Sequence, residues 1–304
     1  MGILNFILIL AASLLFSGII LRTRSIFSGR KGPGMFQPLR DIWKLLRKAS
    51  VYSETTSIIF QAAPSIYFAS VLVAIALIPF GNQAGLISFK GDFVFFAYVL
   101  ALGKFWSIIG ALDTGSSFEG MGASREALYS LLAEPAFFIL MGSFALLTGE
   151  TSFQAIFGKL HFGSSISYGV GLLAAFVLML LTLVENSRMP IDDPKTHLEL
   201  TMVHEVMILD NSGFDLGLIL QATNLKFAMY GALIANFFLT PGSEWYYSIP
   251  IFIAVQVVFA IVIGVVESFM ARFRMNHNAQ YIFTLTSMAL LIFLGVLLML
   301  GRVI

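Results

Sequence analysis

Cysteine is absent from this 304-residue sequence, and charged residues are scarce, at 12%. Without cysteine the chain can form no disulfide, no thiolate nucleophile and no cysteine-ligated iron–sulfur cluster, so any redox centre must belong to a partner. The formal net charge of +1 argues against a nucleic-acid binder. The sequence also lacks a GxSxG elbow and a glycine-rich loop in a phosphate-binding context. It therefore indicates neither a serine hydrolase nor a nucleotide-binding enzyme.

Long apolar runs dominate the chain. Hydrophobic residues make up 58% of it, and the mean hydropathy is +0.88, which is outside the range of a water-soluble domain. Because a bilayer core of about 30 Å needs roughly 20 apolar residues per helix, we predict an all-α polytopic membrane protein with about eight transmembrane helices. The predicted spans are Ile3–Leu21, Ile58–Phe80, Phe93–Leu112, Leu128–Leu147, Tyr168–Val184, Leu216–Leu239, Ile249–Val266 and Ile282–Leu300.

The basic residues are concentrated in the odd-numbered loops between these spans. By the positive-inside rule, those loops face the cytoplasm and both termini lie outside the cytoplasmic (inner) membrane. The N-terminal stretch lacks a basic start and a small-residue cleavage pattern, which indicates a retained span and not a signal peptide. No repeat or linker interrupts the chain. We predict one membrane domain over 1–304, with cytoplasmic loops at about 22–57, 113–127, 185–215 and 267–281.

The first and third of these loops offer surfaces to lipid or to partners. After a glycine- and proline-rich turn, residues from Pro38 to Lys48 place apolar and basic side chains on opposite faces of a helix. This pattern predicts an amphipathic helix at the membrane surface. It could be an interfacial anchor, one wall of a cavity for an amphiphile, or a platform for a soluble partner. The third loop carries Asp113 and Arg125, and it is either a solvated turn or a docking surface.

The most polar stretch runs from Val184 to Asp215 and holds seven of the 17 acidic residues. It separates two apolar runs, so the chain must leave the membrane and re-enter it there. Glu185 ends the fifth run and Arg188 follows three residues later, so the two can pair if the helix continues past Asn186.

Charged residues inside the spans are candidates for function, because each costs about 2.5–3.5 kcal/mol at a helix centre and is seldom kept without a role or a partner. Desolvation moves their pKa values toward neutrality, which suits proton transfer. We interpret Glu134 and Lys226 as functional, and for Glu267 a function and a structural ion pair both stay open. The charged residues within or at the ends of spans are Lys104, Glu134, Lys226 and Glu267.

A metal site is weakly indicated by two His-Glu pairs in the acidic stretch. A zincin helix needs a second histidine four residues after the first, and His204-Glu205 has none. His197 and His204 do share a helical face, but hydrogen-bonded or proton-relaying histidines explain them better. We therefore predict no metal, no cofactor and no catalytic residue in this chain.

Four ordered motifs resemble the membrane subunit that is shared by respiratory complex I and the membrane-bound group 4 [NiFe] hydrogenases, and they are most similar to the formate-hydrogenlyase type. They are GRKGPGMFQPLRDIWKLLRK, ALDTGSSFEGMGASREA, VENSRMP-DDP--HLELTMVHEVMILDNSG and ESFMARFRM. The resemblance implies eight transmembrane helices and a chain that joins a soluble redox module to antiporter-like, proton-pumping membrane subunits. It places the iron–sulfur clusters and the NiFe centre in partners, namely a small iron–sulfur subunit and a large catalytic subunit.

Roles for individual residues follow from this resemblance together with their charge. We expect proton-carrying or field-sensing carboxylates at Glu134, Glu185 and Glu199, with Arg188 holding one of them ionised. The full proton-coupling set is Glu134, Glu185, Arg188, Asp192, Glu199, Lys226 and Glu267. The residues expected to contact partners are His197, His204, Glu205, Asp210, Asp113 and Arg125.

Two other functions remain open. Several motif residues also match the complex I branch, whose subunit contributes to a quinone site, so the alternative is the quinone-site subunit of an NADH or ferredoxin:quinone oxidoreductase. The stretch LTMVHEVMILDNSG departs from that branch and favours the hydrogenase type. A stand-alone secondary transporter is the third possibility, but the inverted internal symmetry typical of that class is not evident.

Overall fold

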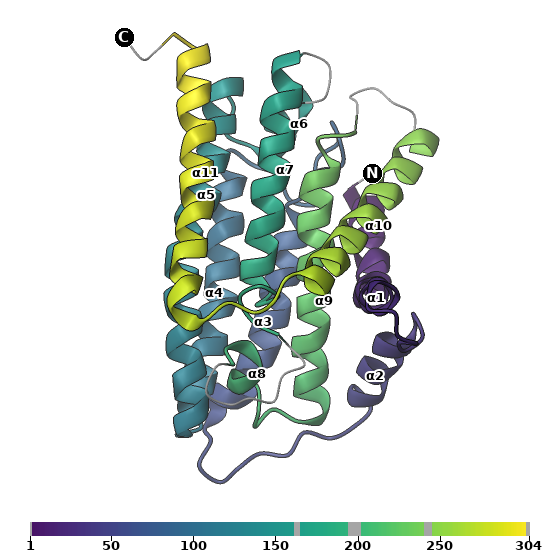
Figure 1. The fold of residues 1–304 in the computed structure, drawn as a ribbon, viewed down its shortest axis with the longest axis vertical. Helices are drawn as coiled ribbons and strands as arrows, with labels where there is room; N and C mark the ends of the chain where they lie inside the picture. Colours follow the sequence, from purple (N-terminus) through teal and green to yellow (C-terminus); the bar gives the residue numbers. More distant parts are fainter. Residues whose placement is uncertain (1, 161–164, 194–201, 240–244, 302–304) are drawn as a thin grey trace.

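The computed structural model describes residues 2–160, 165–193, 202–239 and 245–301. Within these ranges the chain forms helices joined by loops, with no β-strand (Figure 1). The helices are α1 (Gly2–Phe27), α2 (Gln37–Leu45), α3 (Ile58–Ala76), α4 (Asp92–Asp113), α5 (Ser117–Thr148), α6 (Phe153–Lys159), α7 (Ser165–Glu185), α8 (His204–Met207), α9 (Gly213–Ala235), α10 (Trp245–Phe269) and α11 (Met275–Met299).

Within the described ranges, seven helices are long and apolar enough to cross a membrane, and they are α1, α3, α4, α5, α9, α10 and α11. A shorter apolar stretch, Gly169–Glu185, forms most of α7. Each predicted span overlaps one of these helices, so the prediction of an all-α polytopic membrane protein is confirmed.

Several helices extend beyond their predicted spans, and α1 and α5 reach furthest into segments expected in cytoplasmic loops. Helix α1 continues to Phe27, and α5 begins at Ser117, so much of the segment 113–127 that we expected in a loop is helical. Glycine disfavours a helix on its own, but Gly122 has a packing reason to be there. A Cβ at this position would lie 2.8 Å from the carbonyl oxygen of Val203, so the bare backbone lets the segment before α8 press against α5. This contact is invisible in the local sequence.

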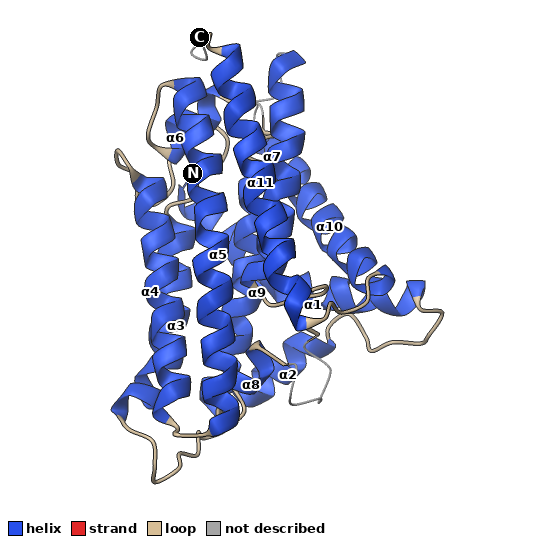
Figure 2. Cartoon of the chain, turned by 60° about the vertical axis from the view of Figure 1, so that its left-hand side comes forward, coloured by secondary structure: helices blue, strands red, loops and turns tan. Residues whose placement is uncertain are grey.

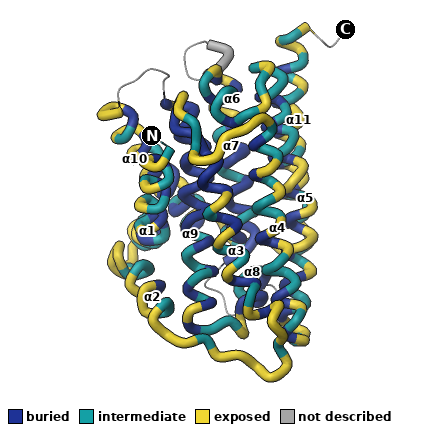
Figure 3. The backbone as a smooth tube through the Cα atoms, turned by 180° about the vertical axis from the view of Figure 1, so that it is seen from behind, coloured by how far each residue is buried: buried dark blue, intermediate teal, exposed yellow. Residues whose placement is uncertain are grey.

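Helix α9 is the centre of the bundle. Of its membrane-crossing window, 78% is buried, against 22–44% for the other six crossing helices. It packs against α1, α3, α7 and α10, and Phe227 stacks on Phe16 of α1 with ring centroids 5.3 Å apart. Figure 3 shows the buried residues gathered between the helices and the exposed ones on the outward faces. Any charge on α9 therefore lies in the interior of the protein.

The predicted amphipathic helix is present as α2, and it begins with Pro38 in its first turn. Ile42 is buried, whereas Trp43 on the other face is 56% exposed and lies under Arg47, whose guanidinium carbon is 4.8 Å from the indole centroid. Helix α2 packs against α9 because Gly217 has no side chain to keep Leu46 away.

The linker from α2 to α3 is tied to the start of α9. The Tyr52 hydroxyl donates a hydrogen bond to Asp215 Oδ2 at 2.7 Å, and this bond raises the pKa of Tyr52. At Gly213, with φ at +52°, a Cβ would lie 2.1 Å from the carbonyl oxygen of Ala49, so glycine is required both by the backbone and by the close approach.

The two ends of the bundle differ. Helices α2 and α8 lie toward one end, together with the link from α4 to α5, while α6 and the C-terminus lie toward the other (Figures 1 and 2). We call the first of these the α8 end. The buried charges described next lie between these ends, and several of them connect to the α8 end.

Candidate functional site

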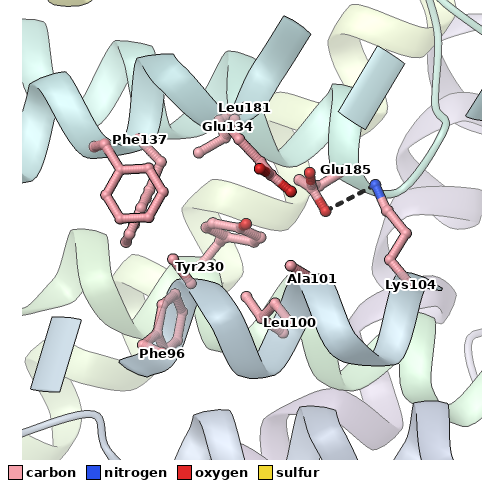
Figure 4. Close-up of a pocket in the computed structure, with 11 residues that line it drawn as sticks. Phe96, Leu100, Ala101, Lys104, Glu134, Phe137, Leu181, Glu185 and Tyr230 are labelled. Carbon is pink, nitrogen blue, oxygen red and sulfur yellow. Dashed lines mark ion pairs between the residues drawn. The ribbon is translucent and has the colours of Figure 1, made fainter. Parts of the chain in front are cut away.

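Four charged side chains from four helices meet in the interior. Lys104 Nζ of α4 is 3.0 Å from Glu126 Oε1 of α5 and 3.0 Å from Glu185 Oε2 at the end of α7. Lys226 Nζ of α9 is 3.0 Å from the same Glu185 oxygen and 2.8 Å from the Glu185 carbonyl oxygen. The order is Glu126, Lys104, Glu185, Lys226, with alternating charge. We call these four residues the inner cluster; Figure 4 shows its Lys104–Glu185 pair.

Local backbone features bring the inner cluster together. Gly103 allows α4 to approach α3 closely, because a Cβ there would lie 1.9 Å from Ser70 Oγ. Helix α7 ends at Glu185, and Ser187 adopts a left-handed conformation with φ at +45°. The Ser187 hydroxyl then donates to Glu126 Oε2 at 3.0 Å. The turn after α7 thus satisfies the second oxygen of a buried carboxylate.

A cavity of about 40 Å³ adjoins the inner cluster. Glu185 and Lys104 form its polar wall, Tyr230 and Phe96 are among its aromatic residues, and Glu134 of α5 also lines it (Figure 4). Although Glu134 lies in the middle of a membrane-crossing helix, it is exposed, and no described side chain forms an ion pair with it. A carboxylate is thus presented laterally at mid-helix.

A second group of charges, the outer cluster, lies around Glu267 near the end of α10. Arg188 Nε is 2.6 Å from Glu267 Oε1, and Arg24 Nη1 of α1 is 3.8 Å from Glu267 Oε2. Arg24 also approaches both Asp193 carboxylate oxygens at 3.4 Å. The Glu267 side chain is 0% exposed. The Arg188 guanidinium lies 5.4 Å from the ring centroid of Phe227, the neighbour of Lys226, so the two clusters are adjacent along α9.

Asp192 anchors the start of α8. Its Oδ2 accepts hydrogen bonds from the backbone N–H groups of Val203, at 3.0 Å, and His204, at 3.1 Å. Its Oδ1 is 2.8 Å from Arg272 Nη2 in the link between α10 and α11. Asp192 is 1% exposed, so this buried carboxylate joins three segments of the chain. The segment around α8 is therefore positioned by charge as well as by packing.

Helix α5 holds the same segment from its other side. Arg125 Nη1 donates to the carbonyl oxygen of Met202 at 2.9 Å, and Glu119 Oε1 accepts a hydrogen bond from the backbone N–H of Asp210 at 2.9 Å. The segment 202–210 is thus fixed at both ends. In the part of the chain that the structure describes, Arg125 acts as an internal contact and Asp210 is exposed at the α8 end.

His204 is the histidine of the acidic stretch that the structure describes. Its Nε2 atom is buried and has no hydrogen-bond partner among the described residues, and the ring is close enough to Glu126 to interact electrostatically with it. Glu205 follows in α8 and is half-buried. His197 and Glu199 lie outside the described residues. Those residues contain no group of three or more His, Asp or Glu side chains arranged to hold a metal ion.

Asp113, which we expected at a partner interface, caps a helix. Its Oδ2 accepts hydrogen bonds from the backbone N–H groups of Ser57, at 2.7 Å, and Phe60, at 3.3 Å, at the start of α3. The Ser57 hydroxyl donates to its Oδ1 at 2.9 Å. The end of α4 therefore fixes the start of α3. Residues in loops can serve such caps as readily as they serve partners.

Sequence reasoning did not select Glu126 as a site residue, and it named Lys104 without giving it a role. The glycines and serines before Glu126 disfavour a helix, so the sequence predicts a loop there. The signal that could have revealed Glu126 is its spacing of eight residues from Glu134, which puts both on neighbouring parts of one helical face. The structure brings Glu126, Glu185 and Lys226 together, and it places Arg188 and Glu267 in the outer cluster.

Comparison with known proteins places this chain in a family. The NADH dehydrogenase family matches residues 1–299. Hydrogenase-4 component C of Escherichia coli (strain K12) is 30% identical over 236 residues, which cover 78% of this chain and 74% of that protein. Formate hydrogenlyase subunit 4 of the same organism is 27% identical over 299 residues, which cover 96% of each chain.

A solved structure has the same fold. A chain in the structure of the membrane-bound sulfane sulfur reductase, an archaeal respiratory membrane complex, aligns with a TM-score of 0.81 at 20% identity, covering 97% of this chain and 98% of that one. The multi-pass architecture, the end-to-end family match and the similarity to the two Escherichia coli proteins agree. This chain belongs to the NADH dehydrogenase family of complex I-like membrane proteins.

Proposed function

We propose that this chain is the membrane anchor and coupling subunit of a complex I-like hydrogenase, linking a soluble iron–sulfur and [NiFe] redox module to antiporter-like subunits that translocate protons or sodium. The family membership and the similarity to hydrogenase-4 component C and formate hydrogenlyase subunit 4 support this choice of complex. In this proposal the α8 end faces the cytoplasm, because the basic loops lie in odd-numbered positions. Both termini then lie on the outer side.

The single observation that carries the proposal is the exposed Glu134 carboxylate in the middle of α5. A bare charge facing lipid would cost about 2.5–3.5 kcal/mol. A neighbouring membrane subunit that covers this face would remove that exposure. Since Glu134 lines the same cavity as Glu185 and Lys104, the covered carboxylate would connect the inner cluster to that neighbour. This is the geometry expected of a subunit that passes charge sideways into a pump.

The inner cluster is suited to respond to a change of charge. Two unit charges 3.0 Å apart interact by about 5 kcal/mol at an effective dielectric constant of about 20, and the Lys104–Glu126, Lys104–Glu185 and Lys226–Glu185 pairs all have this separation. A proton gained or lost by one member therefore changes the proton affinity of the next. Electron transfer in a docked redox module would provide the triggering charge at the α8 end.

The α8 end is the surface we assign to the soluble module. Asp210 is exposed there, and His204 and Glu205 lie on the short helix beside it. Asp192, which is paired with Arg272, fixes the start of α8. A partner that binds Glu205 or Asp210 would therefore contact a segment whose position is already fixed. We expect the small iron–sulfur subunit to make this contact and the large catalytic subunit to attach through it.

Glu134→Gln tests the coupling role in the intact complex reconstituted into liposomes. Glutamine keeps the size of the side chain but cannot carry a proton, and loss of a proton-transfer group commonly costs about 10²–10⁴-fold in the step it serves. Ion pumping should fall steeply, while hydrogenase turnover with a soluble artificial mediator should persist. Glu150→Gln is the matched control, because Glu150 pairs with Lys159 at 2.7 Å beyond the end of α5. Pumping that stays at the wild-type rate in Glu134→Gln would overturn the coupling role.

The quinone-site alternative meets a steric obstacle in this structure. The crevice among α3, α4, α8 and α9, lined by residues such as Tyr67 and Met207, has a volume of about 10 Å³. That is about the space of one water molecule. A quinone headgroup could enter only if α8 moved away from α5, and Gly122, Arg125 and Glu119 all hold that segment in place. This crevice, in its present conformation, therefore does not accommodate a quinone headgroup.

A further inference from the structure

Another cavity, larger than the two described above, lies between α1 and α10, two helices that pack along one edge of the bundle (Figure 1). Its volume is about 200 Å³. The wall is apolar, with Leu8, Ala12, Leu15 and Ile19 from α1 and Ile253 and Val257 from α10. Gln256 is the polar side chain in the wall, and its amide N–H donates to the carbonyl oxygen of Ala228 at 2.9 Å. This crevice is suited to a flexible hydrocarbon chain.

The length of the crevice fits one acyl chain. From Leu8 to Ile19 a helix rises by about 16 Å at 1.5 Å per residue, which is about half of a bilayer core of about 30 Å. Measured along α1, the crevice thus has about the length of one acyl chain. It runs toward the C-terminal end of α1, where charged residues begin, so a bound amphiphile would have its headgroup at that end.

Arg22 continues the α1 side of the crevice. It follows Ile19 by three residues and Leu15 by seven, so all three lie on one helical face. Arg22 is exposed, and the described residues offer it no ion pair. Arg24 lies about 200° away around the helix, at about 100° per residue, and it is engaged with Asp193 and Glu267. Arg24 therefore binds acidic side chains of the protein, whereas Arg22 lies exposed at the end of the crevice.

The surroundings of Arg22 are also basic. Arg30 and Lys31 follow after the end of α1, both are exposed, and no acidic residue lies between Arg22 and Lys31. Phe27 and Phe269 meet across α1 and α10 with ring centroids 5.7 Å apart, and Phe269 is 74% exposed. Aromatic side chains of this kind are common at the level of lipid headgroups. The basic end of the crevice therefore has the character of a membrane interface.

We propose that this crevice is a binding site for an anionic phospholipid, with one acyl chain between α1 and α10 and its phosphate at Arg22. Charge complementarity selects an anionic lipid over a zwitterionic one, because clusters of basic residues next to a transmembrane helix attract anionic headgroups. The site does not depend on the proposed coupling role. It would hold α1, which carries Arg24 of the outer cluster, against α10.

Photo-crosslinking of the intact complex in nanodiscs tests the site. The nanodiscs contain phosphatidylcholine with a small fraction of phosphatidylglycerol that carries a diazirine in its acyl chain, and cross-linked peptides are identified by mass spectrometry. We expect cross-links within Leu8–Ile19 and within Phe252–Val257, and excess unlabelled phosphatidylglycerol, but not phosphatidylcholine, should remove them. Ala12→Phe fills the crevice and should abolish the cross-links. Ala254→Phe, at an exposed position of α10 that does not line the crevice, should leave them unchanged.

Arg22→Gln separates the headgroup contact from the hydrocarbon contact. It should lower cross-linking by phosphatidylglycerol several-fold, to the level of a phosphatidylcholine probe with the same diazirine chain, whereas Lys90→Gln, an exposed lysine before α4, should have no effect. Equal cross-linking by the two lipids in the wild type would show that the crevice holds surrounding lipid without selecting its headgroup. Displacement by a long-tailed quinone but not by phosphatidylglycerol would assign the crevice to a quinone tail. Cross-links confined to another subunit would mean that a partner helix covers it. Each of these three results would overturn the proposal.

Discussion

Replacing Glu185 by glutamine should destabilise the subunit and uncouple it, and these two effects can be separated. Glu185 Oε2 lies 3.0 Å from both Lys104 Nζ and Lys226 Nζ. Without the carboxylate, one positive charge in the inner cluster has no balancing partner. Breaking a buried pair by removing one member costs about 3–5 kcal/mol. Glu185→Gln should therefore lower the unfolding temperature of the detergent-solubilised complex and abolish ion pumping in liposomes.

A second substitution restores the charge balance without restoring the proton carrier. In Glu185→Gln combined with Lys226→Met, the Lys104–Glu126 pair remains at 3.0 Å and the inner cluster is neutral again. We expect most of the lost stability to return, since methionine fills a similar volume without a charge. Pumping should stay absent, because the titratable group at position 185 is still missing.

The two measurements refute different steps of the reasoning. A double variant that is as unstable as Glu185→Gln would contradict the electrostatic explanation of the inner cluster. A double variant that pumps at the wild-type rate would show that Glu185 carries no coupled proton. Redox turnover with a soluble mediator serves as the control in both experiments, since it reports whether the partner subunits and their metal centres are intact. Glu150→Gln should change neither the unfolding temperature nor pumping.

Three further substitutions test other parts of the structure. Gly122→Leu should push Val203 away from α5 and lower the stability of the subunit by about 1–3 kcal/mol through overpacking. It should also weaken retention of the soluble module on a size-exclusion column. Gly120→Leu, whose Cβ would have its nearest neighbour at 3.9 Å, should have neither effect. Trp43→Asp should weaken attachment of the soluble module, and unchanged assembly and activity would reduce α2 to a topogenic signal. A cysteine at Lys195 should react with a membrane-impermeant thiol reagent in opened vesicles and not in sealed cells; labelling of sealed cells would reverse the proposed topology.

The membrane fold could be predicted from the sequence because hydrophobic length is a local property. A run of roughly 20 apolar residues specifies a span whatever its neighbours are, and each predicted span overlaps a helix. The start of α5 could not be predicted in this way. Gly122 disfavours a helix locally, and the contact with Val203 that explains this glycine joins residues far apart in the sequence. That error also hid Glu126, which lies one turn after Gly122.

For the candidate site, too, local features could be predicted from the sequence and contacts between distant residues could not. That Lys104, Lys226 and Glu267 are charged residues within or at the ends of spans is visible in the sequence, because the cost of burying a charge makes each of them conspicuous. Which charge faces which is set by the packing of helices. Asp113 illustrates the difference, since the sequence does not reveal that its hydrogen bonds to Ser57 and Phe60 make it a cap for α3. Its contact with a partner stays a prediction.

Glu185 and Arg188 are the clearest case in which the spacing along the sequence did not give the partner of a charged residue. The two residues could pair only if α7 continued past Asn186, and the helix ends at Glu185 instead. Ser187 then takes a left-handed conformation, with φ at +45°, so the helical spacing that would align the two side chains is lost. Glu185 consequently faces the lysines of the inner cluster, and Arg188 faces Glu267 in the outer cluster. A single turn thus decides that two neighbouring charges serve different clusters, with Asn186 and Ser187 as the covalent link between them.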